Sequence, residues 1–316
     1  MFSIFTRPCT NPAACIRITF QPRVRHFINF IFAVQGHFLY FRPHTLDEAV
    51  YVLASSGGQI LAGGTDFFPS LGDQAVTGTV VDISGLGELK GVVKEPKYIR
   101  IGGLTTWTEV AKTPLPRCFD GLKAAAREIG GIQIQNRATV AGNLCNASPA
   151  ADSVPPLLTL DAEVELVSQA GTRRIGLADF LVGNRKTLRR PGEILSQIFV
   201  PRMVENAGST FLKLGARRYL VISIAMVAAV IQKDSSGRVS EARVAIGSCS
   251  VVARRLPELE HALRGAPVAQ GLGSRVTAEH LKDLSPIDDV RATAAYRREA
   301  ALRLVERALD ACAGSS

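Results

Sequence analysis

The segment Ile132–Asp152, IQIQNRATVAGNLCNASPAAD, is the most informative part of this sequence. Its 21 residues are mostly small or amide side chains, and only Arg137 and Asp152 are charged. A buried core segment would hold more Leu, Ile and Phe, and a disordered linker would hold more charge and less Val and Ile. We therefore expect another molecule to approach this backbone very closely.

The sequence contains two glycine segments. The first is Leu61-Ala-Gly-Gly-Thr-Asp66, and the second, Thr139-Val-Ala-Gly-Asn143, lies within Ile132–Asp152. Both belong to apolar sequence typical of strands. Glycine lets a large anionic group reach main-chain N–H donors, and neighbouring Thr and Asn side chains add hydrogen bonds. Either segment alone more often marks a tight loop or bulge. Together they predict a site that could hold a pyrophosphate.

The first glycine segment follows a predicted helix and strand. Thr45 and Glu48 predict a capping box, Gly57-Gly58 ends the helix, and residues 59–62 form a strand. This order is opposite to a doubly wound dinucleotide fold, where the glycines lie between a strand and the helix it feeds. The apolar face of the helix is predicted to contain Ala49, Val50, Leu53 and Ala54.

The rest of the chain has a mixed α+β pattern. The glycine-rich phosphate-loop and serine-hydrolase motifs do not occur in it. Strands are predicted at 80–83, 98–101, 163–168, 172–175, 226–234 and 238–246, the last four as two hairpins, and helices from Thr106, at 121–129 and at 290–312.

Composition excludes several other classes. Residues 1–46 contain five Arg and no acidic residue, so the net charge of +9 leaves only +4 for the remaining 270 residues. No basic stripe with interleaved aromatics indicates nucleic-acid binding. The longest apolar run, Tyr219–Ile231, is too short to cross a bilayer, which needs about 20 residues. Six scattered cysteines without C-x-x-C spacing predict reduced cytosolic thiols, and this chain alone is not expected to hold an iron–sulfur cluster.

Residues 1–37 are basic, lack acidic residues and include an apolar patch interrupted by Asn29. We interpret them as a poorly ordered extension or the product of a start codon placed too far upstream. A cleaved targeting segment is the alternative.

Four motifs, AGGTDFFPSL, NRATVAGNLCNASPAAD, GNRKTLRRPGEIL and FLKLGARR, occur in this order between Phe38 and Cys312. In order and spacing they resemble the FAD-binding (medium) subunit of the molybdenum hydroxylases, the family of xanthine dehydrogenase and carbon monoxide dehydrogenase. The resemblance implies an α+β fold with a two-lobed FAD-binding domain of the vanillyl-alcohol oxidase (PCMH) type, residues 38–205 with lobes of about 38–95 and 96–205. A smaller C-terminal α+β domain, residues 206–316, would follow it.

The resemblance also implies which residues contact FAD. The two glycine segments would wrap the diphosphate and ribityl region, and Asp152 would hydrogen-bond the cofactor. Leu195 would make an apolar contact to the flavin, and Lys213 would lie near the isoalloxazine ring and favour the anionic reduced form by Coulomb attraction. The full predicted set is Leu61, Ala62, Gly63, Gly64, Thr65, Asp66, Phe67, Thr139, Val140, Ala141, Gly142, Asn143, Asp152, Leu195 and Lys213. No catalytic residue and no metal ligand is predicted.

Several of these residues have a purely structural alternative. Asp152 could cap a following helix, Leu195 could be simple core, and Lys213 could be a solvated strand residue. Ala141 replaces a glycine that the family often carries. We expect a negative φ there, at which alanine costs little, whereas a positive φ or close phosphate contact would weaken binding.

The function implied by the resemblance is electron transfer within a cytoplasmic heterotrimer. A large molybdopterin subunit would oxidise the substrate, a small subunit with two [2Fe-2S] clusters would relay electrons, and FAD in this chain would pass them to NAD, a quinone, ferredoxin or oxygen. One alternative is a self-sufficient FAD oxidase or dehydrogenase, which would need a general base near the flavin, although all five histidines lie outside the glycine segments. The other is a scaffold subunit that has lost its flavin.

Overall fold

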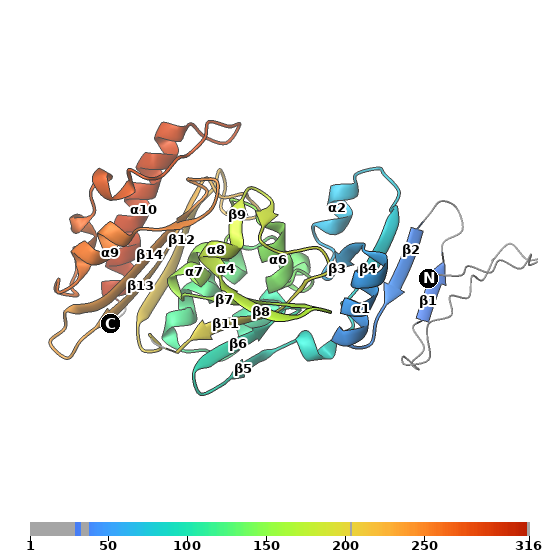
Figure 1. The fold of residues 1–316 in the computed structure, drawn as a ribbon. Coiled ribbons are helices and arrows are strands. Elements are labelled where there is room, and N and C mark those ends of the chain that lie inside the picture. Colours follow the sequence, from blue (N-terminus) through green and yellow to red (C-terminus); the bar gives the residue numbers. More distant parts are fainter. Residues whose placement is uncertain (1–28, 33–37, 203, 315–316) are drawn as a thin grey trace, which may run out of the picture.

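The computed structural model describes residues 29–32, 38–202 and 204–314. Figure 1 shows three main sheets that follow one another along the molecule in chain order. The expectation for the N-terminal extension lies outside the described residues, apart from strand β1 (Asn29–Phe32). The predicted domain limits, at 37/38, 95/96 and 205/206, stay predictions.

The N-terminal sheet combines parallel and antiparallel strands. Strands β2 and β3 each pair in parallel with β4, and β1 pairs with β2 in the antiparallel direction. In spatial order the strands are β1, β2 (Phe38–Arg42), β4 (Gly78–Asp82) and β3 (Gln59–Leu61).

Helix α1 (Leu46–Ser56) covers this sheet (Figure 1). The Thr45 hydroxyl accepts the Glu48 N–H as predicted, but the Glu48 carboxylate accepts from the N–H of His44, so the reciprocal half of the capping box is wrong. The helix ends at Gly57, whose φ of 63° suits glycine. Ala54 was expected on the apolar face and is exposed instead. The buried face consists of Ala49, Val50, Val52 and Leu53.

The central sheet is fully antiparallel, and its strands contribute to the hydrophobic cluster with the most buried residues. Its strands are, in order, β5 (Val92–Lys94), β6 (Tyr98–Gly102), β11 (Ile194–Pro201), β7 (Glu163–Ser168) and β8 (Gly171–Gly176). The predicted hairpin of β7 and β8 is confirmed. A two-stranded ribbon of β9 (Leu181–Gly183) and β10 (Lys186–Thr187) leads into β11.

Short helices lie between the strands of the N-terminal and central sheets and between the central and C-terminal parts of the chain. They are α2 (Phe67–Leu71), η1 (Gly87–Leu89), α3 (Trp107–Lys112), η2 (Arg117–Phe119), α4 (Asp120–Glu128), α5 (Ile132–Gln135), α6 (Val140–Asn146), α7 (Val154–Thr159) and α8 (Leu177–Phe180). Helix α3 has the complete capping box predicted from Thr106 and Glu109. The segment from Thr139 was expected to be a turn in strand-like sequence; it is helical instead, with Thr139 as N-cap.

The C-terminal sheet has helices on both faces. Its order is β12 (Gly208–Leu214), β13 (Ala225–Lys233), β14 (Val239–Gly247) and β15 (Arg254–Arg255). One face packs on α9 (Pro257–Leu263) and α10 (Ala294–Gly314). The short helices η3 (Leu272–Arg275) and η4 (Ala278–Leu281) pack against α10. The other face packs on α4 and α7 of the central region.

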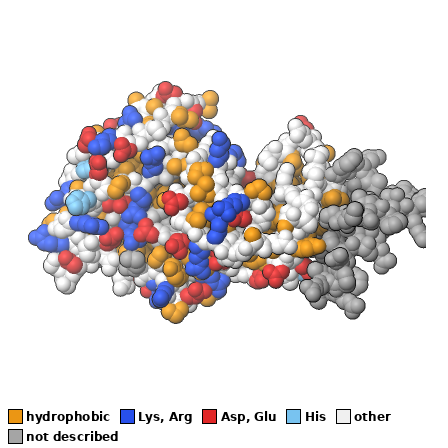
Figure 2. All heavy atoms as spheres, viewed as in Figure 1, with side chains coloured by type: hydrophobic (Ala, Val, Ile, Leu, Met, Phe, Trp, Pro, Cys, Tyr) orange, Lys and Arg blue, Asp and Glu red, His pale blue; other side chains and the backbone are white. Residues whose placement is uncertain are grey.

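The surface is mixed in character. On the face shown in Figure 2, Lys and Arg side chains are interspersed with Asp and Glu over the central and C-terminal regions. Within the described ranges, no helix is long and apolar enough to span a membrane.

Replacing Leu309 by Ala tests the C-terminal core. Leu309 is fully buried on α10, so we expect its truncation to lower the free energy of unfolding by about 2–5 kcal/mol. Leu302 lies on the same helix and is only partly buried, so Leu302→Ala should cost clearly less. Urea unfolding followed by circular dichroism measures both, and equal losses would contradict the described packing.

Candidate functional site

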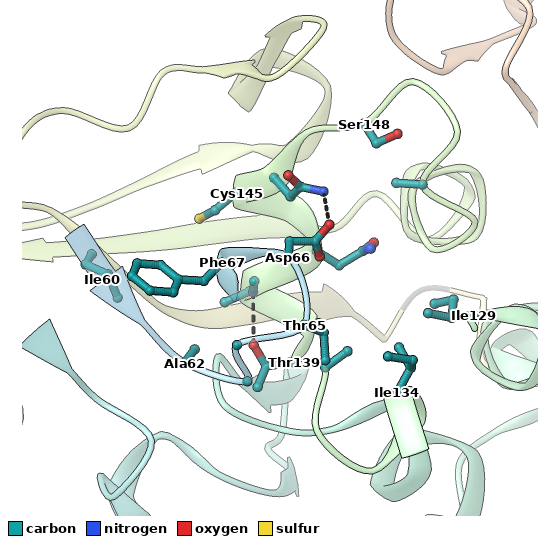
Figure 3. Close-up of a pocket in the computed structure, with 18 of the residues that line it drawn as sticks. Ile60, Ala62, Thr65, Asp66, Phe67, Ile129, Ile134, Thr139, Cys145 and Ser148 are labelled. Carbon is teal, nitrogen blue, oxygen red and sulfur yellow. Dashed lines mark hydrogen bonds between the residues drawn. The ribbon is translucent and has the colours of Figure 1, made fainter. Parts of the chain in front are cut away.

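A cavity with a volume of about 710 Å³ is lined by residues from all three sheet regions. It lies where the N-terminal lobe, the central region and the start of the C-terminal sheet meet, and both glycine segments line it. This volume falls within the range usual for cofactor and small-molecule sites, about 300–1,000 Å³. Figure 3 shows residues of both segments facing the same space, among them Thr65, Asp66 and Thr139.

All predicted site residues line this cavity except Leu61 and Val140. Val140 is fully buried in the central core, where the helix turns its side chain away from the cavity. Leu61 is the last residue of β3, and its carbonyl accepts the N–H of Ile83. These two residues hold the segments in place without lining the site.

The absence of a side chain at Gly63 allows the two segments to touch. A Cβ atom at this position would lie 2.0 Å from the main-chain oxygen of Arg137. Gly64 has a φ of 77°, a conformation that L-residues rarely adopt. The two consecutive glycines therefore meet separate requirements, one for close approach and one for backbone conformation.

The first segment also offers a row of free main-chain donors. Within the described residues, the N–H groups of Gly63, Gly64, Thr65 and Asp66 donate to no protein acceptor. All four residues line the cavity. Consecutive unpaired N–H groups of this kind form a concave site for anionic oxygen atoms.

The second segment contributes differently, because the main-chain N–H groups of residues 140–143 already have acceptors. The N–H groups of Val140 and Ala141 donate to the carbonyls of Thr105 and Gly103, and the Gly142 N–H donates to the Thr139 hydroxyl. Ala141 lies in α6 with negative φ, as expected, so alanine causes no backbone strain there. This segment supplies small side chains and hydroxyl or amide groups to the cavity wall.

A chain of polar side chains links the two segments at the cavity. The amide of Asn146 donates to the Asp66 carboxylate at 2.9 Å (Figure 3), and its oxygen accepts from Arg185. Arg185 and Arg189 both line the cavity and were not among the predicted residues. Both belong to the motif GNRKTLRRPGEIL, so the signal for them was present in the sequence.

Asp152 and Lys213 form a buried ion pair that the sequence did not predict. The Lys213 Nζ lies 2.6 Å from Asp152 Oδ2, and the Ser223 hydroxyl donates to Asp152 Oδ1 at 2.5 Å. Burial raises the pKa of the Asp152 carboxyl, while Lys213 and Ser223 oppose this rise. Helix α7 begins after Ser153 without a side-chain cap, so the alternative role of Asp152 as helix cap is wrong. Lys213 is nearly buried and is not a solvated strand residue.

The remaining wall is apolar. Leu195 is buried in β11, and Phe67, Ile60 and Cys145 lie along one side of the cavity (Figure 3). Burial raises the pKa of the Cys145 thiol to about 11, so this thiol is protonated at neutral pH. Within the described part of the chain, no cluster of three or more His, Cys, Asp or Glu side chains could hold a metal ion.

Comparison with known protein families covers most of the chain. The model described as "FAD binding domain in molybdopterin dehydrogenase" matches residues 32–203. The model described as "CO dehydrogenase flavoprotein C-terminal domain" matches residues 210–312.

Individual relatives agree with these matches. The xanthine dehydrogenase FAD-binding subunit of Escherichia coli O157:H7 is 34% identical over 263 residues, which are 82% of this chain and 90% of that protein. The nicotinate dehydrogenase FAD-subunit of Eubacterium barkeri is 34% identical over 239 residues, covering 73% and 81%. A structure of carbon monoxide dehydrogenase from Hydrogenophaga pseudoflava, lacking the Mo-pyranopterin moiety of its cofactor, matches with a TM-score of 0.81 at 27% identity, over 89% of this chain and 98% of that chain.

These matches confirm the resemblance stated from the motifs and the predicted α+β fold, an FAD-binding domain followed by a C-terminal flavoprotein domain. They also confirm FAD as the cofactor and oxidoreductase as the enzyme class. This chain therefore belongs to the family of FAD-binding subunits of the molybdenum-containing dehydrogenases and hydroxylases.

Proposed function

We propose that this protein is the electron-transfer flavoprotein subunit of a molybdenum-containing hydroxylase or dehydrogenase. It would take electrons from [2Fe-2S] clusters of a partner subunit and pass them to an external acceptor. When bound, FAD supplies the ability to accept and release electrons singly or in pairs. The protein's own part is to bind this cofactor, orient it and limit which molecules reach it.

The observation that carries the proposal is the cavity with its four N–H donors at residues 63–66, which have no acceptor among the described residues. A diphosphate needs several donors at close range, and glycine removes the Cβ atoms that would keep it away. The side chains of Arg185 and Arg189 add positive charge to the same cavity. We therefore assign the diphosphate to the first glycine segment and the neighbouring part of the second.

Other residues of the cavity wall suit the flavin ring. Leu195 offers an apolar surface, and Lys213 and Asp152 lie together at the cavity wall. The lysine ammonium uses two donors within the described residues, one to Asp152 and one to the carbonyl of Glu128. We propose that its third donor faces the isoalloxazine ring. Leu61 and Val140 are assigned supporting positions, since neither lines the cavity.

Partner subunits follow from the same proposal. Similar proteins include the medium subunit of nicotine 6-hydroxylase, 28% identical, and the medium chain of carbon monoxide dehydrogenase, 27% identical. We propose that this chain likewise assembles with a large molybdopterin-binding subunit and a small [2Fe-2S] subunit. We also propose a cytoplasmic location, since Cys118, Cys145 and Cys249 carry free thiols.

The first experiment is the absorbance spectrum of the chain purified after expression alone, followed by acid release and identification of any nucleotide. We expect the bands of an oxidised flavin and released FAD. A folded, colourless protein that also fails to bind added FAD would refute cofactor binding by this chain.

Replacing Gly63 by Ala should weaken FAD binding at least about tenfold, which corresponds to about 1.4 kcal/mol. The added Cβ would collide with the Arg137 carbonyl and push the two glycine segments apart. Gly87→Ala is the matched control, because a Cβ there meets no atom within 4 Å and Gly87 does not line the cavity. Titration of the apoprotein with FAD gives the affinities, and thermal unfolding verifies that each variant is folded. Equal affinities would contradict the proposed position of the diphosphate.

The partner proposal is tested by tagging this chain in its native host and analysing the co-purified proteins. We expect stoichiometric polypeptides that carry molybdenum and two [2Fe-2S] clusters, and reduction of the flavin only when they are present. Reduction of the isolated flavoprotein by an organic substrate would instead support the self-sufficient oxidase alternative.

A further inference from the structure

Both oxygens of the Asp152 carboxylate accept a hydrogen bond, one from Lys213 and one from Ser223. Asp152 Oδ2 accepts from Lys213 at 2.6 Å, and Oδ1 accepts from Ser223 at 2.5 Å. Only 8% of the Lys213 side chain and 7% of the Asp152 side chain are exposed. Both carboxylate oxygens are therefore satisfied by hydrogen bonds, the condition under which a buried ion pair is tolerated.

Pairing changes the electrostatic effect of Lys213 on a neighbouring group. A single ammonium would attract a negatively charged ring strongly across a dry cavity. A carboxylate 2.6 Å from the ammonium cancels much of that field, leaving the weaker field of a dipole. The charge presented to the cavity thus depends on how firmly Asp152 is held.

The backbone next to Ser223 is held by a buried arginine of the C-terminal helix α10. The guanidinium of Arg297 donates to the carbonyl of Ile224, the residue after Ser223, at 2.6 Å. It is 3% exposed and is fixed by Asp289 at 2.7 Å. Hydrogen bonds therefore connect Asp152, through Ser223 and the neighbouring Ile224, to Arg297 of α10.

The same arginine reaches the loop that carries Asp152. Arg297 also donates to the carbonyl of Ser248 at 3.3 Å, and the Ser248 N–H donates to the carbonyl of Pro149. Pro149 lies three residues before Asp152. Arg297 thus supports both segments whose side chains meet at the carboxylate.

We propose that Ser223, supported by Arg297, is a positioning residue that keeps Asp152 against Lys213, and that this balanced pair, rather than the lysine charge alone, sets the reduction potential of bound FAD. The inference rests on the proposed function. It adds a role for two residues that do not belong to the motif-derived site.

The test is a double-mutant cycle with the flavin midpoint potential as readout. Asp152→Asn leaves the ammonium unbalanced, so the potential should rise as the reduced, anionic flavin is stabilised. Lys213→Met leaves the carboxylate unbalanced, so the potential should fall. The double variant should lie closer to the original protein than either single variant does. Shifts of the same sign in both single variants would indicate general structural damage and overturn the proposal.

Ser223→Ala provides a milder variant if Asp152→Asn does not fold. Loss of the hydroxyl donor weakens the hold on the carboxylate, so the potential should shift in the same direction as in Asp152→Asn and by less. An unchanged potential would remove Ser223 from the proposed role. Glu279→Gln and Lys282→Met are the matched controls, because this pair, 2.9 Å apart, is exposed and does not line the cavity.

Failure of this inference can be distinguished from failure of the proposed function. If the original protein binds no FAD, the proposed function fails. If all variants bind FAD with one common potential, only the balanced-pair inference fails. Thermal unfolding of the apoproteins supplies a readout independent of the flavin, in which each single variant should be less stable than the double variant.

Discussion

The close contact between Gly63 and the main chain at Arg137 is the constraint on which the site depends. Two segments that are remote in sequence can form one wall only if no side chain separates them at this point. Gly64 then turns the chain with a φ of 77°, and the N–H groups of residues 63–66 have no acceptor in the described part of the chain. The cavity therefore depends on backbone contact between the two glycine segments, and its lining combines main-chain donors with charged side chains.

A second constraint operates across the junction with the C-terminal sheet. Met226 and Phe211 of that sheet pack against Ala125 of α4, which places β12 beside the cavity. Lys213 on β12 thereby meets Asp152, and both residues line the cavity together with the glycine segments. Apolar packing between sheet and helix thus determines where the buried charges lie.

The sequence predicted the fold class, seven of the fifteen described strands and thirteen of the 34 residues that line the cavity, because short motifs and hydrophobic periodicity are local signals. It failed where the outcome depends on contacts between distant residues. Thr139, which was expected in a turn of strand-like sequence, caps helix α6 instead. The Glu48 carboxylate accepts the His44 N–H and does not complete the predicted capping box. The Asp152–Lys213 pair joins residues 61 positions apart, and Ser223 is 71 positions from Asp152. A local sequence pattern cannot predict a contact between residues so far apart. Asp152 and Lys213 were therefore each predicted to contact the cofactor, and their ion pair was not predicted.

The route from Arg297 to Asp152 has a consequence for chimaeric proteins built from relatives of this family. By the predicted boundary at residue 206, Asp152 belongs to the first domain, whereas Lys213, Ser223 and Arg297 belong to the second. Exchanging the C-terminal domain between two relatives would therefore replace one member of an ion pair together with its supports. The two halves of the chain must be inherited as a matched set wherever their pairing residues differ, even though each half has its own hydrophobic core.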